Sequence, residues 1–250
     1  MVTTLPEKPV ARDTTTMHEI IWLYAQTRWG KTRFLFTVNC VTDKNKSGHN
    51  LVLDFHQGKQ TRNESGYKLT VEDWDHYIEI AKDLYKSGGK QFSFVSCDQL
   101  DGMYNMAAAY LLKKHNITSG FAHETDIPYK GTKLVVQEVY RSLLKISSFD
   151  WVKTVFVTSQ ETLKDIQQRS AYQKTLPGPL TGAANEELIK KLTPHCLGIL
   201  FGDKETNDQG EESRVFRLDS SMFHYAGLKV DDVPDTIPAD WKELRKYLKV

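Results

Sequence analysis

A single cysteine, Cys97, stands where a buried strand is followed by a helix. The run 91–96, Gln-Phe-Ser-Phe-Val-Ser, predicts the strand, and the apolar periodicity of 103–115 predicts the helix. Backbone N–H groups at a helix N-terminus lower the pKa of a thiol, and the thiolate is the reactive form. The sequence therefore offers Cys97 as a candidate nucleophile of a hydrolase, against the alternative of a buried structural thiol.

The segment from Trp74 to His115 resembles the core of a cysteine-dependent dual-specificity phosphatase, and rhodanese-like domains share that layout. In such a site a His precedes the cysteine, and an Arg in the following loop clamps the oxyanion. Here Ser96 replaces the His, and the loop after Cys97 contains Asp98 and Asp101 but no Arg. These carboxylates would raise the thiol pKa. The resemblance implies a phosphatase-like hydrolase, either active or catalytically silent.

Two histidines have carboxylates close in sequence, and each is a candidate general base. His56 lies near Asp54, and His123 lies beside Glu124 and near Asp126. If the chain is an enzyme, we expect Cys97, His56 and His123 to carry the catalysis. A structural or solvent-exposed role for each histidine is the alternative.

We recognise no complete motif for binding a metal ion or a cofactor. We recognise no Gly-rich phosphate loop, no Gly-x-Ser-x-Gly elbow and no kinase glycine signature. The three cysteines are far apart, and no histidine pair has zinc-protease spacing. The segment Asp43–Asp54 has the oxygen-ligand spacing of a calcium loop, but its flanks predict strands, which favours a polar hairpin loop. We therefore expect no metal and no cofactor.

Aromatic and basic residues alternate after the first apolar run, which is typical of surfaces that bind single-stranded nucleic acid. The candidate binding residues are Arg28, Trp29, Lys31 and Arg33. Strands with an aromatic core face and a basic solvent face give the same pattern. Nucleic-acid binding is therefore the third hypothesis, behind two others.

Composition limits the class of protein. The chain has 250 residues and a hydrophobic content of 40%, which is typical of globular proteins. Its 33 basic residues are balanced by 32 acidic ones, so the net charge gives no strong overall field that would attract nucleic acid or anionic membranes. No apolar stretch approaches membrane-spanning length, and the first residues do not form a signal peptide. We expect a cytoplasmic protein that does not bind membranes.

The order of apolar runs predicts an α/β or α+β fold with a β-rich N-terminal quarter, central βα units with a partly parallel sheet, and a mixed α+β C-terminal part. We expect a hairpin within 18–41 from the runs 20–24 and 34–38, a strand at 51–55, helices at 70–85 and 132–146, a strand at 152–157 and a helix opening near Ser159. The Pro-Gly-Pro segment 176–180 divides the chain. We predict an arm at 1–16, a main domain at 17–175 and an extension at 180–250 packed on the same core.

Near-neutral charge and the lack of a complete catalytic motif favour a non-catalytic structural or self-associating protein, of viral coat, matrix or occlusion-lattice type. The alternatives are the phosphatase-like hydrolase and the nucleic-acid-binding protein. Self-association is the partner that we expect.

Overall fold

The computed structural model describes residues 19–38, 40–43, 46–56, 65–89, 91–116, 131–167, 171–178 and 182–248. Its strands are β1 (Glu19–Ala25), β2 (Cys40–Asp43), β3 (Lys46–Asp54), β4 (Tyr67–Thr70), β5 (Phe92–Asp98), β6 (Thr154–Gln167), β7 (Ala171–Pro177), β8 (Cys196–Thr206), β9 (Glu212–Arg217), β10 (Gly227–Leu228) and β11 (Thr236–Pro238). Its helices are α1 (Lys31–Thr37), α2 (Trp74–Ser87), α3 (Leu100–Lys114), α4 (Gly131–Ser147), α5 (Gly182–Leu192) and α6 (Trp241–Leu244). The predicted arm and His123 lie outside the described residues.

A central sheet organises the molecule, in the order β11-β9-β8-β1-β6-β5-β3-β2. Strands β8, β1, β6, β5, β3 and β4 run parallel, while β2, β9, β10 and β11 pair antiparallel with their neighbours. Because β1 pairs with β6 on one side and β8 on the other, its carboxyl end lies in the middle of the sheet edge. The expected α/β class with a partly parallel sheet is confirmed.

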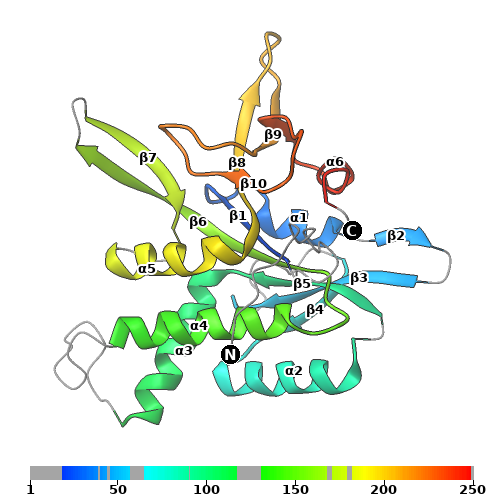
Figure 1. Ribbon diagram of the computed structural model, residues 1–250, viewed down its shortest axis with the longest axis vertical. Coiled ribbons are helices and arrows are strands. Elements are labelled where there is room, and N and C mark those ends of the chain that lie inside the picture. Colours follow the sequence, from blue (N-terminus) through cyan, green and yellow to red (C-terminus); the bar gives the residue numbers. More distant parts are fainter. Residues whose placement is uncertain are drawn as a thin grey trace, which may run out of the picture.

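Helices cover both faces of the sheet (Figure 1). Helices α2, α3, α4 and α5 pack on one face, and α1 and α6 pack on the other. The run Ile20–Leu23 is fully buried because its alternate side chains enter the two opposite cores. A continuous apolar run is therefore the signature of this central strand.

The helix predicted near 70–85 is confirmed as α2. The carboxylate of Asp73 accepts the backbone N–H of His76 at 2.8 Å and caps the first turn. Gly88, with φ at 64°, ends the helix in the left-handed region. The expected helix at 132–146 is also confirmed, as α4.

The predicted hairpin within 18–41 is wrong. Its first run forms β1, but most of its second run, Phe34–Val38, lies in helix α1. Phe34, Phe36 and Thr37 are residue types with high β propensity, yet the segment is helical and the side chains of Phe34 and Leu35 pack in the core beneath α1. Burial at tertiary contacts therefore outweighs local propensity here.

The helix expected near Ser159 is also wrong. Strand β6 continues through this point to Gln167 and pairs antiparallel with β7 from Glu161 to Gln167. Figure 1 shows this β6–β7 hairpin extending away from the sheet, as do the β8–β9 and β2–β3 hairpins. The β6–β7 and β8–β9 hairpins continue from the carboxyl ends of β6 and β8, whereas the β2–β3 hairpin lies at the amino end of β3, at the opposite edge of the sheet.

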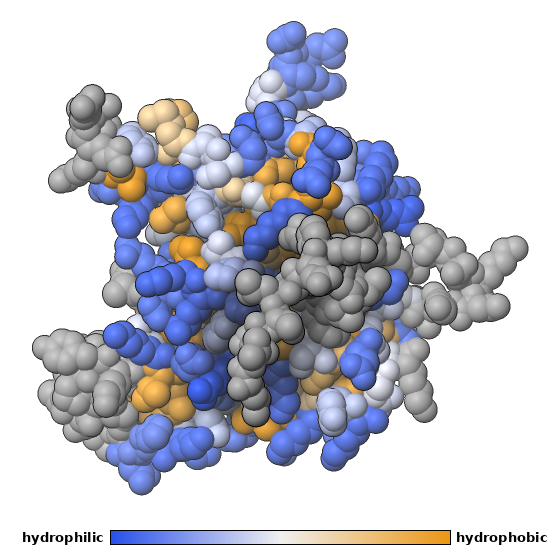
Figure 2. Space-filling view, viewed as in Figure 1, coloured by the Kyte–Doolittle hydropathy of each residue, from blue (hydrophilic) through white to orange (hydrophobic). Residues whose placement is uncertain are grey.

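The surface drawn in Figure 2 is hydrophilic over most of its area, with apolar residues in separate groups. Among the described residues, no helix is both long enough and apolar enough to cross a membrane. The division into a main domain and a C-terminal extension stays a prediction, although β8 and β9 from the extension join the same sheet as β1 and β6.

Candidate functional site

The loop between β1 and α1 has a chemically distinctive sequence. Residues 25–32 read Ala-Gln-Thr-Arg-Trp-Gly-Lys-Thr, which is the G-x-x-x-x-G-K-[ST] spacing of a phosphate-binding loop with Ala25 at the first position. Gly30 has φ at 107° and Arg28 has φ at 66°, so the backbone turns sharply before the helix. The loop lies at the carboxyl end of a central parallel strand, where open α/β sheets bind ligands.

The alanine at the first loop position is accommodated by the neighbouring strand. Ala25 pairs with Gly202 of β8, and a Cβ on Gly202 would lie 2.9 Å from the Cβ of Ala25. The same added Cβ would lie 2.7 Å from the ring of Trp29. A glycine on β8 thus leaves room for the side chains of the loop.

Trp29 anchors the loop to the β8–β9 hairpin. Its ring is buried against Phe216 with centroids 5.5 Å apart, and its indole N–H donates to the carbonyl of Asp203 at 2.8 Å. The packing of Trp29 and its hydrogen bond therefore hold the loop in place.

Lys31 is buried and its ammonium group lies within the loop. Its Nζ donates to the carbonyls of Ala25 at 2.8 Å and Gln26 at 2.9 Å, and to Oε1 of Gln160 at 3.3 Å. Burial lowers the pKa of Lys31 to about 8, against the opposing effect of Asp98, Glu161 and Asp101. The lysine is thus a desolvated cation held by neutral acceptors.

Thr32 and Asp98 meet beside Lys31. The hydroxyl of Thr32 donates to Oδ2 of Asp98 at 2.7 Å, and the hydroxyl of Thr158 on β6 donates to Oδ1 at 2.6 Å. Asp98 is fully buried at the end of β5, and burial raises its pKa while the two hydroxyl groups oppose that shift. A loop hydroxyl and a strand-end carboxylate are thereby held together.

Gln160, on β6, connects the two sides of the site. Its Oε1 accepts the hydroxyl of Thr27 at 3.0 Å and its Nε2 donates to Oε1 of Gln99 at 3.2 Å. Burial raises the pKa of the neighbouring Glu161, which Lys31 partly offsets. Residues of the loop 25–32, of β6 and at the end of β5 therefore form one polar network at the carboxyl edge of the sheet.

His56 lies on the β3 side of this network. Its Nε2 is 3.6 Å from Oδ2 of Asp101, and its backbone N–H donates to Asp54 at 2.8 Å. The neighbouring Asp101 carboxylate raises the pKa of His56, and the charge of His56 in turn lowers the pKa of Asp98. The candidate base predicted from sequence therefore lies within electrostatic reach of Asp98.

The other residues predicted from sequence lie in different settings. Cys97 is fully buried in the core, and burial raises the pKa of its thiol to about 12, which is opposite to what a nucleophile requires. Of the predicted nucleic-acid-binding residues, Trp29 and Lys31 are buried and Arg28 and Arg33 are exposed. His56 is thus brought near the loop, whereas Cys97 points into a core.

A cavity of about 520 Å³ opens on the other side of His56, between α2 and α3. Its lining includes Glu72, Asp73 and Asp75, whose carboxylates would repel an anion. Among the residues that the structure describes, no three His, Cys, Asp or Glu side chains cluster as a metal site. Of the segment considered as a calcium loop, Asp43 and Asp54 lie on β2 and β3, and residues 44–45 lie outside the described part.

Comparison with known proteins identifies the family. The family model described as "AAA domain" matches residues 18–227. Among solved structures, the chain is similar to a KaiC-like protein from Pyrococcus horikoshii (11% identity, 80% of this chain and 77% of that one, TM-score 0.41). It is also similar to the RadB recombinase (17% identity, 85% and 86% coverage, TM-score 0.41). No curated protein matches. These likenesses are distant, whereas the family match covers most of the chain.

The chain belongs to the AAA domain family. This membership, together with the loop 25–32, points to a P-loop ATPase-type nucleotide-binding protein and overturns the structural-protein hypothesis and its viral coat, matrix and lattice variants. It equally overturns the phosphatase-like hypothesis, and nucleic-acid binding as the chain's defining function.

The phosphate loop was not predicted from the sequence, and neither were Thr32, Asp98 and Gln160 as site residues. The loop has one glycine instead of several, and the aromatic run after it imitates a strand. The signal that could have found it is Gly-Lys-Thr directly after a buried apolar run.

Proposed function

We propose that this protein binds a nucleoside triphosphate together with Mg²⁺ in the loop 25–32 and hydrolyses it. The observation that carries the proposal is the hydrogen bond between Thr32 and Asp98, beside the buried Lys31. A loop Ser or Thr and a strand-end Asp are the two groups that hold Mg²⁺ in P-loop NTPases. Family membership supports the same class of activity.

Lys31 provides the cation for the phosphates. Its ammonium group now donates to the carbonyls of Ala25 and Gln26, which are neutral acceptors. Phosphate oxygens would form stronger, charge-assisted hydrogen bonds with the same group. Binding of the triphosphate therefore exchanges carbonyl acceptors for anionic ones, and the backbone N–H groups of the loop add further donors.

The Thr32 hydroxyl and the Asp98 carboxylate fit a magnesium ion, because hydroxyl and carboxylate oxygens are ligands that Mg²⁺ accepts. When bound, the ion would neutralise the charge that develops on the phosphates. Thr158 holds the other oxygen of Asp98 and so fixes the orientation of its carboxylate. The two groups are already positioned before any ligand arrives.

His56 is our proposed base for the attacking water. A neutral His accepts a proton well near pH 7, and Asp101 at 3.6 Å orients the ring and stabilises its protonated form. Gln160 is a second polar group at the same edge, within 3.3 Å of the Lys31 ammonium. Both contribute to hydrolysis rather than to the initial hold on the phosphates.

The test compares wild type with Lys31→Ala for binding and hydrolysis of MgATP. Lys153→Ala is the matched control, because Lys153 is exposed and precedes β6, at the opposite end of the sheet. We expect Lys31→Ala to lose both activities and Lys153→Ala to keep them. Wild-type protein that neither binds nor hydrolyses any nucleoside triphosphate would refute the proposal.

Self-association also remains part of the proposal, together with a cytoplasmic location. Exposed apolar side chains that favour it are Leu163, Met222 and Phe223. Light scattering over a concentration series, with and without MgATP, tests it, and a strict monomer at high concentration in both conditions contradicts it.

A further inference from the structure

Arg214 of β9 lies against the glycine of the phosphate loop. A Cβ placed on Gly30 would be 2.6 Å from Nη1 of Arg214 and 3.2 Å from its Cζ. The guanidinium group therefore touches the backbone immediately before Lys31 and Thr32. The two elements are far apart in sequence, so this approach is made by the fold.

The strand geometry explains why Arg214 faces the loop. Alternate residues of a strand share a face, so Arg214 and Phe216 project to the same side. Phe216 packs against Trp29 of the loop and, at 4.9 Å between centroids, against Phe34 of α1. Arg214 and Phe216 are thus neighbours on the face of β9 that contacts the loop.

The backbone of Arg214 is held on both sides. It pairs with Lys204 of β8, and its carbonyl accepts the N–H of Ala239 at 3.0 Å. The side chain therefore projects from a paired strand whose position is set by the sheet.

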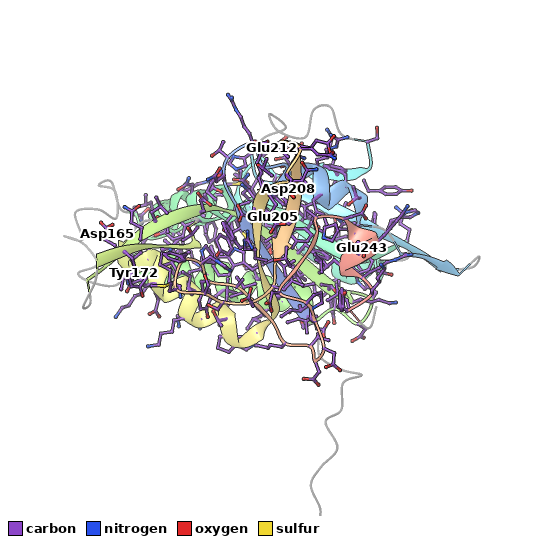
Figure 3. The ribbon with its side chains drawn as sticks, turned by 90° about the horizontal axis from the view of Figure 1, so that it is seen from above. Asp165, Tyr172, Glu205, Asp208, Glu212 and Glu243 are labelled. Atoms are coloured by element: carbon purple, nitrogen blue, oxygen red, sulfur yellow. The ribbon has the colours of Figure 1, made fainter. Side chains whose placement is uncertain are left out.

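The charge of Arg214 is not used within the described part of the chain. The other cations of the hairpin have partners there: Lys204 pairs with Glu212 at 2.7 Å, and Arg217 pairs with Asp203 at 2.7 Å and with Glu205. No described carboxylate pairs with Arg214, whose side chain is exposed. Figure 3 shows the labelled Glu205, Asp208 and Glu212 along the projecting β8–β9 hairpin. Carboxylates are close by in sequence, yet the guanidinium lies on the phosphate loop instead.

We propose that Arg214 binds the phosphate chain of the nucleotide held by the loop 25–32, as a second cation opposite Lys31. This inference rests on the proposed function. A guanidinium group carries a full positive charge and binds phosphate oxygens through a planar pair of N–H donors. Arg214 would therefore add a second positive charge to the one that Lys31 supplies at this loop.

The experiment measures the affinity of ATP and of inorganic tripolyphosphate, each with Mg²⁺, by titration calorimetry. Tripolyphosphate has the phosphate chain without ribose or base, so it separates a phosphate contact from stacking on the base. We expect Arg214→Gln to weaken both ligands by about tenfold or more. Arg214→Lys, which keeps the charge, should recover part of the loss for both.

Arg217→Gln is the control, because it removes the same charge from the same strand while its side chain faces the opposite side and pairs with Asp203. It should leave both affinities within about twofold of wild type. Melting of each variant without ligand shows whether any loss comes from unfolding. Reduced affinity in a variant that melts like wild type is the supporting result.

Two outcomes would overturn the inference. Arg214→Gln could bind both ligands like wild type, or it could lose affinity for ATP alone, which would place the side chain on the base or ribose. Either result leaves the proposed function intact if Lys31→Ala still abolishes binding. If wild type itself does not bind ATP, the proposed function fails first.

Discussion

Replacing Asp98 by Asn should separate the stability of the fold from the use of Mg²⁺. Asn keeps the shape of the side chain, and its amide can still pair with the hydroxyl groups of Thr32 and Thr158. Burial already raises the pKa of the Asp98 carboxyl, so the folded protein gains little from keeping the charge there. We expect the free energy of unfolding without ligand to change by less than about 1 kcal/mol.

With nucleotide the difference should be large. A ligand at 100 times its Kd stabilises the folded state by about 2.7 kcal/mol. For a chain of this size, that corresponds to a rise in Tm of about 5–10 °C. If loss of the carboxylate weakens Mg²⁺-dependent binding by about 100-fold, the same ligand concentration stabilises the variant by only about 0.4 kcal/mol, or about 1 °C.

The assay is thermal unfolding of wild type and Asp98→Asn, each without ligand, with ATP plus EDTA, and with ATP plus Mg²⁺. The expected pattern is equal Tm values without ligand and a Mg²⁺-dependent increase in wild type alone. An equal Mg²⁺-dependent increase in both proteins would refute the role assigned to Asp98. Asp165→Asn, at an exposed carboxylate on the outer part of the β6–β7 hairpin in Figure 3, controls for the general loss of one charge.

Three further predictions follow from the same site. Because the pKa of Lys31 is about 8, affinity for ATP should fall about tenfold at pH 9, one unit above that pKa. The nucleotide-free protein should gain stability between pH 8 and 10.5, because in this range only the unfolded chain binds the proton of Lys31. ATP titration measures the first trend and urea unfolding the second, and a Lys31→Met variant that kept both trends would contradict the prediction. Asp101→Asn should lower the raised pKa of His56, so that the acid limb of the pH–rate profile of hydrolysis moves to lower pH. The variant should also lose the stability that this pair contributes below about pH 6.5, which in wild type is lost as pH rises through the folded-state pKa of His56. An unchanged pH–rate profile would count against His56 as the base. Gly202→Ala should destabilise the fold by about 1–3 kcal/mol in denaturant unfolding, because the added Cβ would meet Trp29 at 2.7 Å and Ala25 at 2.9 Å. Adding Ala25→Gly should recover part of the lost stability. No destabilisation would show that the loop is not held by this contact.

The parts of the fold that could be predicted from sequence are those with a strong local signal. Helix α2 has a capping Asp73, a periodic apolar face and the terminal Gly88. Strand β5 is a short apolar run between turn residues. These elements have the same conformation that their local sequence prefers, so their type was predicted correctly.

Helix α1 and the end of β6 could not be predicted in the same way. The residues Phe34-Leu35-Phe36-Thr37 favour a strand, but the chain must turn after Gly30 to enter a helix, and burial of Phe34 and Leu35 stabilises that choice. The β6–β7 hairpin extends beyond the sheet core, where the apolar period is weak. Tertiary contacts decide both, and they are not visible in a window of the sequence.

Of the candidate catalytic residues, His56 and Cys97 lie in the described part of the chain and can be compared with the proposed site. His56 was predicted as a candidate base because Asp54 is close in sequence, and the end of β3 that carries Asp54 lies at the same sheet edge as the phosphate loop. Cys97 was predicted as a nucleophile at the junction after β5. The side chain that faces the site is instead that of its neighbour Asp98, because successive residues of a strand point to opposite faces. A shift of one residue thus separates the predicted nucleophile from the proposed magnesium ligand.

The most direct test of the account is equilibrium binding of MgATP to the wild-type protein and to Lys31→Ala, with Lys153→Ala as the control. We expect saturable binding to wild type and to Lys153→Ala, and a loss of at least about tenfold in affinity for Lys31→Ala, because this variant lacks the buried cation of the loop. Equal affinity of all three proteins, or no binding by any of them, would contradict a nucleotide site at residues 25–32.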